Sequence, residues 1–248
     1  MSPESPYYRD DLALVHHLGF GFHADATAPG IIALLDPVRE RNGLVLELGC
    51  GSGLLTRHLL DAGHRVTATD ASAAMLDLAR QTAPDAEAIR RIVLPDDPLP
   101  EADAVVSVGH VLSYLDDEDQ VARALVAAAD ALRPGGVLAV DLEDLRWGEV
   151  RADAPPSGRV GDDWAIVLEY ESPAPNRFAR KMACFVRSDD GTWRRDDEQH
   201  WNTLIDTSAV PALLAEHGVE AEVRGSFGLE QLPDGLVAVV GHKPAGRF

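Results

Sequence analysis

A group of glycine and acidic residues in the first third of the chain has the types and spacing of a nucleoside-binding loop. Gly49, Gly51 and Gly53 follow a short apolar run, Glu47 comes shortly before them, and Asp70 ends the next apolar run. Glycine lacks a Cβ, so a ligand can approach the backbone closely. The loop and the helix N-terminus after it would face this ligand, and the Asp70 carboxylate would accept hydrogen bonds from ribose hydroxyls.

Two ligand classes compete for this pattern. A dinucleotide loop has the spacing G-x-G-x-x-G, but here the third glycine comes one residue early and Leu54 takes the place of the last one. The E-x-G-x-G-x-G pattern from Glu47 to Gly53 resembles motif I of class I S-adenosylmethionine (SAM) dependent methyltransferases. The LRPGG turn at residues 132–136 is a second resemblance to that family. Together they imply SAM as the methyl donor, with S-adenosylhomocysteine as its product.

The resemblance also implies which residues would hold SAM. Glu47 and the glycines would line its methionine part, Asp70 would bind the ribose, and Met75 would approach the adenine. The acidic residue that the family often places after its third strand is absent from the matching position, and Asp96 is the nearest candidate. The predicted cofactor contacts are Glu47, Gly49, Cys50, Gly51, Gly53, Asp70, Ala71, Met75, Asp96 and Ser107.

Candidate catalytic residues follow the strands that end at the ligand edge. His110 and Tyr114 come just after the strand expected at residues 102–108, and His200 lies in a later strand. A neutral histidine accepts a proton from an attacking hydroxyl or ammonium, and the N-terminal histidines are further candidates for this role. Acidic residues at the end of the strand expected at residues 137–141 would be able to bind a cationic substrate group: Asp141, Glu143 and Asp144.

The elements around these residues predict an α/β fold with a doubly wound, seven-stranded, mostly parallel sheet, similar to the Rossmann-like methyltransferase fold. Apolar runs bounded by turn residues predict strands at residues 44–48, 65–70, 88–94, 102–108, 137–141, 219–223 and 236–240. Helical spacing predicts helices at residues 10–18, 29–41, 54–62, 72–82, 120–132 and 208–217.

The chain is expected to divide into three parts. Residues 1–42 would form an N-terminal helical lid, and residues 43–143 with 207–248 would form the SAM-binding core. Residues 144–206 would insert a three-stranded antiparallel sheet with strands at 164–171, 179–187 and 193–205, which serves as a substrate cover or a dimer contact. So small a sheet needs a surface to pack on.

Composition limits the partners. The 248 residues carry 41 acidic and 22 basic side chains, a net charge of −19, which argues against nucleic acid and anionic membranes as partners. The chain has no apolar run of about 18 residues, and its polar N-terminus does not resemble a signal peptide. These features favour a cytoplasmic protein. Cys50 and Cys184 are the only cysteines, so we expect neither a disulfide nor a metal site.

The sequence therefore predicts a SAM-dependent methyltransferase that acts on an oxygen or nitrogen of a small natural-product or metabolic acceptor. A nucleic-acid methyltransferase would need a basic face and usually an Asn/Asp-Pro-Pro-Tyr/Phe motif, where this chain has Gly109-His110-Val111-Leu112. Leu54 disfavours an NAD-dependent oxidoreductase. The alternative that stays open is a SAM-binding protein without methyl transfer, acting as a regulator or as a catalyst that keeps SAM as a scaffold.

Overall fold

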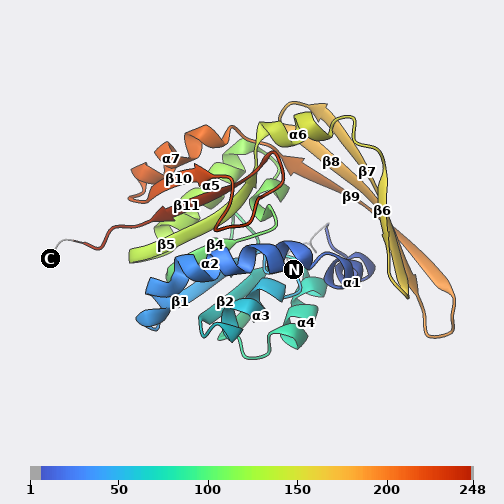
Figure 1. The fold of residues 1–248 in the computed structure, drawn as a ribbon, viewed down its shortest axis with the longest axis horizontal. Coiled ribbons are helices and arrows are strands. Elements are labelled where there is room, and N and C mark those ends of the chain that lie inside the picture. Colours follow the sequence, from blue (N-terminus) through green and yellow to red (C-terminus); the bar gives the residue numbers. More distant parts are fainter. Residues whose placement is uncertain (1–6, 247–248) are drawn as a thin grey trace.

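A seven-stranded sheet forms the centre of the protein in the computed structural model, which describes residues 7–246 (Figure 1). Its strand order is β10-β11-β5-β4-β1-β2-β3, and neighbouring strands are parallel except where β11 pairs with β10 and β5. This arrangement confirms the predicted mostly parallel sheet. Its strands are β1 (Leu44–Leu48), β2 (Arg65–Asp70), β3 (Ala88–Arg91), β4 (Ala102–Ser107), β5 (Leu132–Glu143), β10 (Glu220–Arg224) and β11 (Leu236–His242).

Helices cover both faces of the sheet, which makes it doubly wound. Helices α2, α3 and α4 lie on one face, where Leu35 and Leu59 are fully buried, while α5 and α7 bury Leu125 and Leu214 on the other. The helices are α1 (Asp10–Gly19), α2 (Phe22–Glu40), α3 (Leu54–Asp61), α4 (Ala73–Thr82), η1 (Val111–Tyr114), α5 (Glu118–Ala131), α6 (Leu145–Arg151), η2 (Thr207–Ala209) and α7 (Val210–Glu216).

The strand order reverses beside β1. The chain runs outward from β1 through β2 to β3 and then returns to β4 on the other side of β1. In open α/β sheets a ligand crevice forms at such a reversal, outside the carboxyl ends of the strands. Gly49, Asp70, Gly109 and Glu143 lie at or just after the carboxyl ends of β1, β2, β4 and β5, and the first three of them line one pocket.

The inserted sheet has four strands, so the prediction of three was wrong. The missed strand β6 is short and all four of its residues are exposed, so it shows no alternating pattern. Helix α6, which leads into the insertion, was also missed, because it has only seven residues and contains Gly148. The strands, in the order β6-β7-β8-β9, are antiparallel: β6 (Ser157–Val160), β7 (Trp164–Ala174), β8 (Arg177–Arg187) and β9 (Trp193–Thr203).

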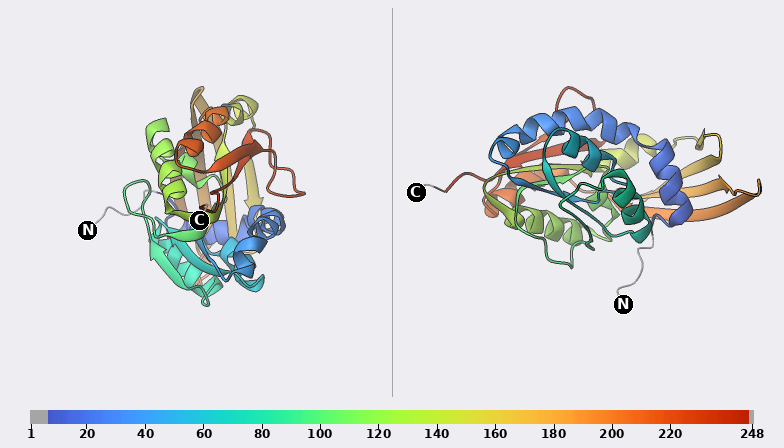
Figure 2. Two further views of the ribbon diagram at one scale, coloured as in Figure 1. Left: turned by 90° about the vertical axis from the view of Figure 1, so that its left-hand side faces the viewer. Right: turned by 90° about the horizontal axis from the view of Figure 1, so that it is seen from below.

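Helix α1 packs between the inserted sheet and the core. Figures 1 and 2 show the inserted sheet as a curved layer at one end of the molecule, with α1 beside it. Leu12 and Val15 of α1 are buried in a separate apolar cluster with Ile166 of β7 and Met182 of β8. This contact provides the packing surface that so small a sheet requires.

Several element boundaries differ from those expected. Helix α2 begins at Phe22 and not at Pro29, which lies inside it, while β3 ends at Arg91. The predicted turn at residues 132–136 lies within β5, where Gly135 has φ +81°. Among the described residues, no single helix is long and apolar enough to span a membrane; α1 and α2 reach that length and hydropathy only together, across a bend of 64°.

Candidate active site

The glycine loop leaves β1 with three residues in the left-handed region. Gly49, Gly51 and Gly53 have φ values of +67°, +53° and +83°, a conformation that other residues adopt only at a cost. A Cβ on Gly49 would lie 2.3 Å from the Val111 side chain. The sequence requirement for glycine is therefore conformational at all three positions and also steric at Gly49.

Asp70 holds this loop against the end of β2. One carboxylate oxygen accepts the Gly51 N–H at 2.9 Å, and the other accepts the Ser72 N–H at 2.8 Å. Desolvation raises the pKa of Asp70, and these two hydrogen bonds oppose that shift. A carboxylate oxygen has two lone-pair sites, so each oxygen of Asp70 retains one acceptor position for a ligand.

The loop and Asp70 open on a pocket of about 340 Å3, which we call the main pocket. It runs from the glycine loop past β2 and α4 to the turn after β4, and the N-terminal segment and η1 complete its wall. Of the predicted site residues, this wall contains Gly49, Gly51, Asp70, Ala71, Met75 and Tyr114. The other lining residues are Tyr7, Tyr8, His16, Thr69, Ser72, Arg91, Ile92, Val93, Leu94, Val108, Gly109, Val111, Leu115, Asp116 and Gln120.

Four predicted cofactor contacts lie behind this wall. Glu47 is buried and accepts a hydrogen bond from the Thr56 hydroxyl at 2.7 Å, and desolvation raises its pKa to about 8. Ser107 is fully buried in β4, and Cys50 is buried with a raised thiol pKa. The fourth, Gly53, precedes α3. These residues shape the loop from beneath and do not line the main pocket.

The structure does not bring Asp96 to the main pocket. Its side chain is 77% exposed and pairs with Arg123 at 3.0 Å. The Asp97 carboxylate instead accepts the Val93 N–H at 2.8 Å and closes a turn. The pocket wall after β3 is therefore formed by the lining residues 92–94 and carries no acidic side chain there.

A second carboxylate, Asp141, fixes the turn after β4. It accepts the N–H groups of Gly109 and His110 at 2.8 and 2.7 Å and lies 3.0 Å from Nε2 of His23. His110 consequently sits at φ +50°, in the left-handed region. Asp141 thus holds the turn, and Asp144 likewise accepts from Arg146 and Thr207. Neither acid lines the main pocket.

Four more side chains gather behind Tyr114, and with it they form what we call the polar cluster (His110, Tyr114, Glu143, Arg180 and His200). Arg180 donates from Nη2 to Nε2 of His110 at 3.1 Å and to the Tyr114 hydroxyl. His110 Nε2 lies 3.7 Å from a Glu143 carboxylate oxygen. The ring centres of Tyr114 and His200 are 5.5 Å apart. The cluster therefore joins β5, η1, β8 and β9.

Several buried polar atoms of this cluster have no hydrogen-bond partner within the described chain: Nε of Arg180, both carboxylate oxygens of Glu143 and Nδ1 of His200. Such orphans are costly in a protein interior. Desolvation raises the pKa of Glu143 to about 8 and lowers that of His110 well below 6.5. The cluster thus offers unused donors and acceptors to a polar ligand.

His200 is oriented by a neighbouring carboxylate. Its Nε2 lies 2.8 Å from Glu198, and both side chains are almost wholly buried. This contact makes Nε2 the protonated nitrogen and leaves Nδ1 as a lone pair. Desolvation lowers the pKa of His200, against the effect of the Glu198 hydrogen bond. A neutral imidazole with a free lone pair is the form of a general base.

Sequence reasoning missed Arg180 and Glu198. Their strands β8 and β9 alternate, so that the side facing the core reads Phe178, Arg180 and Met182 on β8. An arginine on the apolar side of a strand indicates a candidate site residue, since charged side chains are seldom buried unless they are paired. Glu198 and His200 lie on the same side of β9, and this spacing of two polar residues in a covered strand also indicates a candidate site.

Comparisons with known proteins agree with this geometry. Residues 45–136 match the family described as methyltransferase domain. The trans-aconitate 2-methyltransferase of Paracidovorax citrulli is 36% identical over 132 residues, which are 49% of this chain and 50% of that protein. The chain thus spans about half the length of this relative. A putative methyltransferase of Bacillus subtilis is 30% identical over 186 residues, 72% of this chain and 74% of that protein.

A solved structure shows that the likeness extends to the whole fold. The sugar N-methyltransferase of Streptoalloteichus superposes with a TM-score of 0.77, covering 98% of each chain at 21% identity. Because this superposition covers nearly the entire chain, the inserted sheet and the N-terminal helices are part of the shared fold.

Proposed function

The chain belongs to the SAM-dependent methyltransferases, and we propose that it moves the methyl group of SAM to an oxygen or nitrogen of a small-molecule acceptor. The observation that carries the proposal is the position of the main pocket. It has the glycine loop and Asp70 on one side and Tyr114 of the polar cluster on the other. A donor and an acceptor would then meet within one pocket.

The residues of the main pocket fit SAM. Gly49 and Gly51 bring bare backbone to the pocket, and Asp70 retains an acceptor position on each oxygen for a ribose hydroxyl. Met75 and Val93 give the far end an apolar wall for an adenine. SAM would supply an activated methyl group on a sulfonium with a good leaving group. The protein's task is then mainly to align the nucleophile and to exclude water.

The polar cluster is where we place the acceptor. Arg180 offers an unused donor, and Glu143, whose pKa is raised to about 8, offers both a donor and an acceptor while it is protonated. An acceptor with both hydroxyl or amine and carbonyl or carboxylate groups would satisfy them. Relatives support a small acceptor, since their names give trans-aconitate in one case and a sugar nitrogen in another. We therefore propose a compact polar metabolite as the acceptor.

His200 is our candidate for the general base among the three predicted catalytic residues. The Nε2 lone pair of His110 already accepts from Arg180, and desolvation raises the pKa of Tyr114 well above 10. His200 keeps a free Nδ1, with Glu198 on its other nitrogen. A hydroxyl nucleophile would need this base, whereas a carboxylate is already ionised and a neutral amine would lose its proton after methyl transfer.

Release of S-adenosylhomocysteine tests the proposed function. The purified protein is incubated with SAM labelled on its methyl group and a panel of small organic acids and amino sugars. We expect the label to move to an acceptor in step with S-adenosylhomocysteine release. Tight SAM binding without label transfer to any polar acceptor would instead support a SAM-binding protein that performs no transfer. The proposal includes a cytoplasmic location and no nucleic-acid or membrane partner, and it includes the inserted sheet as substrate cover or homodimer contact.

A further inference from the structure

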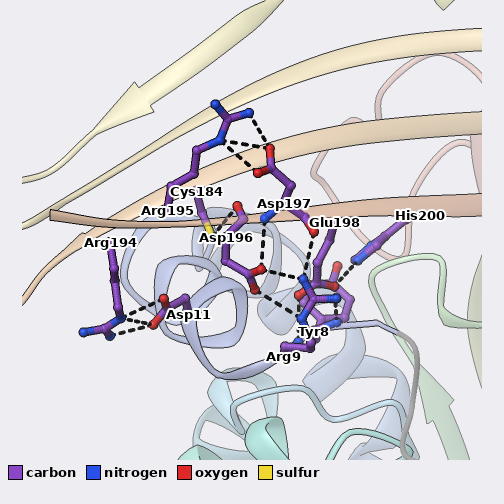
Figure 3. A network of polar contacts seen from close by, with 10 residues as sticks. All are labelled: Tyr8, Arg9, Asp11, Cys184, Arg194, Arg195, Asp196, Asp197, Glu198 and His200. Carbon is purple, nitrogen blue, oxygen red and sulfur yellow. Dashed lines mark hydrogen bonds and ion pairs between the residues drawn. The ribbon is translucent and has the colours of Figure 1, made fainter.

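A buried carboxylate on the inserted sheet binds the backbone at the start of the described chain, where the Arg9 side chain also pairs with Asp196 at 2.6 Å and donates to the Asp197 carbonyl. Figure 3 shows Glu198 of β9 beside Tyr8 and Arg9. Its two oxygens accept the backbone N–H groups of Tyr8 at 2.7 Å and Arg9 at 2.8 Å, and one of them also lies 2.8 Å from Nε2 of His200. The Glu198 side chain is 1% exposed, so these contacts are shielded from water and from salt.

The other end of Tyr8 is held by the donor side of the site. The Ser72 hydroxyl donates to the Tyr8 carbonyl at 2.8 Å, and the Ser72 N–H donates to Asp70. One residue therefore connects the inserted sheet, through Glu198, to the carboxylate that we assign to the ribose. The Tyr8 hydroxyl also lies 2.8 Å from that of Tyr114. We call Tyr8 and Arg9 the latch.

The latch does not adopt its conformation by itself. Tyr8 has φ +57°, in the left-handed region that a bulky side chain rarely occupies. Such a backbone persists only where the surrounding contacts impose it. The hydrogen bonds at the Tyr8 N–H, carbonyl and hydroxyl are those contacts, and loss of the strongest of them would let the residue return to an extended backbone.

The latch is a partition between two cavities. Tyr8, Ala71, Ser72 and Arg91 line both the main pocket and a second, outer pocket of about 670 Å3. A shift of the latch would join the two pockets and open the ribose end of the main pocket to the outside. Closure of the donor site thus depends on a contact made by the sheet that faces the acceptor.

We propose that Glu198 is a positioning residue that fastens the latch over bound SAM, so that the inserted sheet controls how long the donor stays. This inference rests on the proposed function for the identity of the ligand. Under this proposal the inserted sheet does more than cover the site, because the Glu198 contact that closes the donor pocket also sets the tautomer of His200. The donor side and the acceptor side of the site would consequently close together.

The test compares Glu198→Gln with Asp197→Asn in the full-length protein. Glutamine preserves size and one acceptor, but its NH2 group cannot accept a backbone N–H. Asp197 is the neighbouring acid, exposed and paired with Arg195 on its own strand at 2.6 Å, so it is a matched control. Hydrogen–deuterium exchange is measured at Tyr8 and Arg9, and release of labelled SAM is measured with an unlabelled chase.

For Glu198→Gln we expect exchange at these two amides and SAM release to become faster by about tenfold, as for loss of one charge-assisted hydrogen bond. Exchange in the core strands should stay as in the native protein, which a general loss of stability would not allow. Native protection of Tyr8 and Arg9 in Glu198→Gln, or an equal effect of Asp197→Asn, would overturn the proposal.

If Glu198→Gln does not fold, Ser72→Ala frees the Tyr8 carbonyl and is judged by the same two measurements. Failure of the native protein to bind SAM would refute the proposed function, while the exchange result would still decide the latch.

Discussion

Replacement of Asp70 by asparagine should weaken SAM binding while leaving the protein folded. In the native structure each carboxylate oxygen accepts one backbone N–H, from Gly51 or from Ser72. Each then has one lone pair for a ribose hydroxyl. An asparagine side chain keeps one such oxygen and places an NH2 group where the other was. It therefore loses the charge, one ribose contact and one bond to the loop.

The size of this loss follows from hydrogen-bond energies. A hydrogen bond to a charged group contributes about 1.5–3 kcal/mol net. Loss of one such bond, with weakening of the other, gives about 2–3 kcal/mol, or roughly 30- to 150-fold in the dissociation constant. One backbone N–H is also left without its acceptor, at a cost of about 1–3 kcal/mol to folding, so each preparation needs a thermal melt beside the binding curve.

Calorimetry with SAM and with a 2′,3′-dideoxyribose analogue of SAM separates the ribose contact from general damage to the loop. Native protein should bind the analogue more weakly than SAM, and this preference for SAM should be smaller in Asp70→Asn, which keeps only one of the two ribose contacts. Asp77→Asn is the control, because Asp77 is an exposed acid that pairs with Arg80 on the same helix. Unchanged SAM affinity in a folded Asp70→Asn protein would refute the assignment of Asp70 to the ribose.

Three further substitutions test the buried groups. Glu47 has a pKa of about 8 in the folded protein and a normal pKa in the unfolded chain, so the free energy of unfolding should fall as pH rises from about 4.5 to 8. Chemical unfolding of Glu47→Gln should show a flatter dependence of this free energy on pH. The same dependence in the native protein and in Glu47→Gln would contradict this prediction. Arg180→Lys keeps the charge but loses the planar donors to His110 and Tyr114. The KM for the acceptor should therefore rise about tenfold at unchanged SAM affinity. A change in SAM affinity with an unchanged KM for the acceptor would contradict the assignment of Arg180 to the acceptor site. His200 has a lowered pKa, so for a hydroxyl acceptor kcat should fall with acid below pH 6.5. His200→Gln should remove this inflection, and its persistence would exclude His200 as the base.

The donor half of the site could be predicted from sequence because it is almost continuous. The residues from Glu47 to Asp70 form strand, loop, helix and strand, and their spacing fixes which backbone groups meet. Two of its predicted contacts, Glu47 and Asp96, lie outside the pocket wall. Alternate residues of a covered strand point to opposite faces, so Glu47 turns toward Thr56 beneath α3 and only the loop reaches the pocket. Asp96 was chosen for its place in the chain, but Asp97 closes the turn there instead.

The missed elements lacked the signal on which sequence prediction depends. The residues of β6 are all exposed, so no core selects an alternating pattern in that strand. Pro29 suggested a helix start, since proline is favoured there, yet α2 begins a full two turns earlier at Phe22. That earlier part is stabilised by contacts which depend on the folded core, such as the one between His23 and Asp141. Helix propensity, which is read from the local sequence, takes no account of such contacts.

The proposed acceptor half is assembled from distant segments, and this explains why the sequence identifies the donor more readily than the acceptor. Tyr8, Tyr114, Glu143, Arg180 and His200 come from five separate segments of the chain, and their chemistry arises only where these segments meet. The polar cluster lies largely on the inserted sheet and on the turns that face it, not on the glycine loop. If the acceptor binds there as proposed, substitutions in the polar cluster should alter the acceptor without disturbing the glycine loop. The similar proteins are named for different acceptors, trans-aconitate in one case and a sugar nitrogen in another.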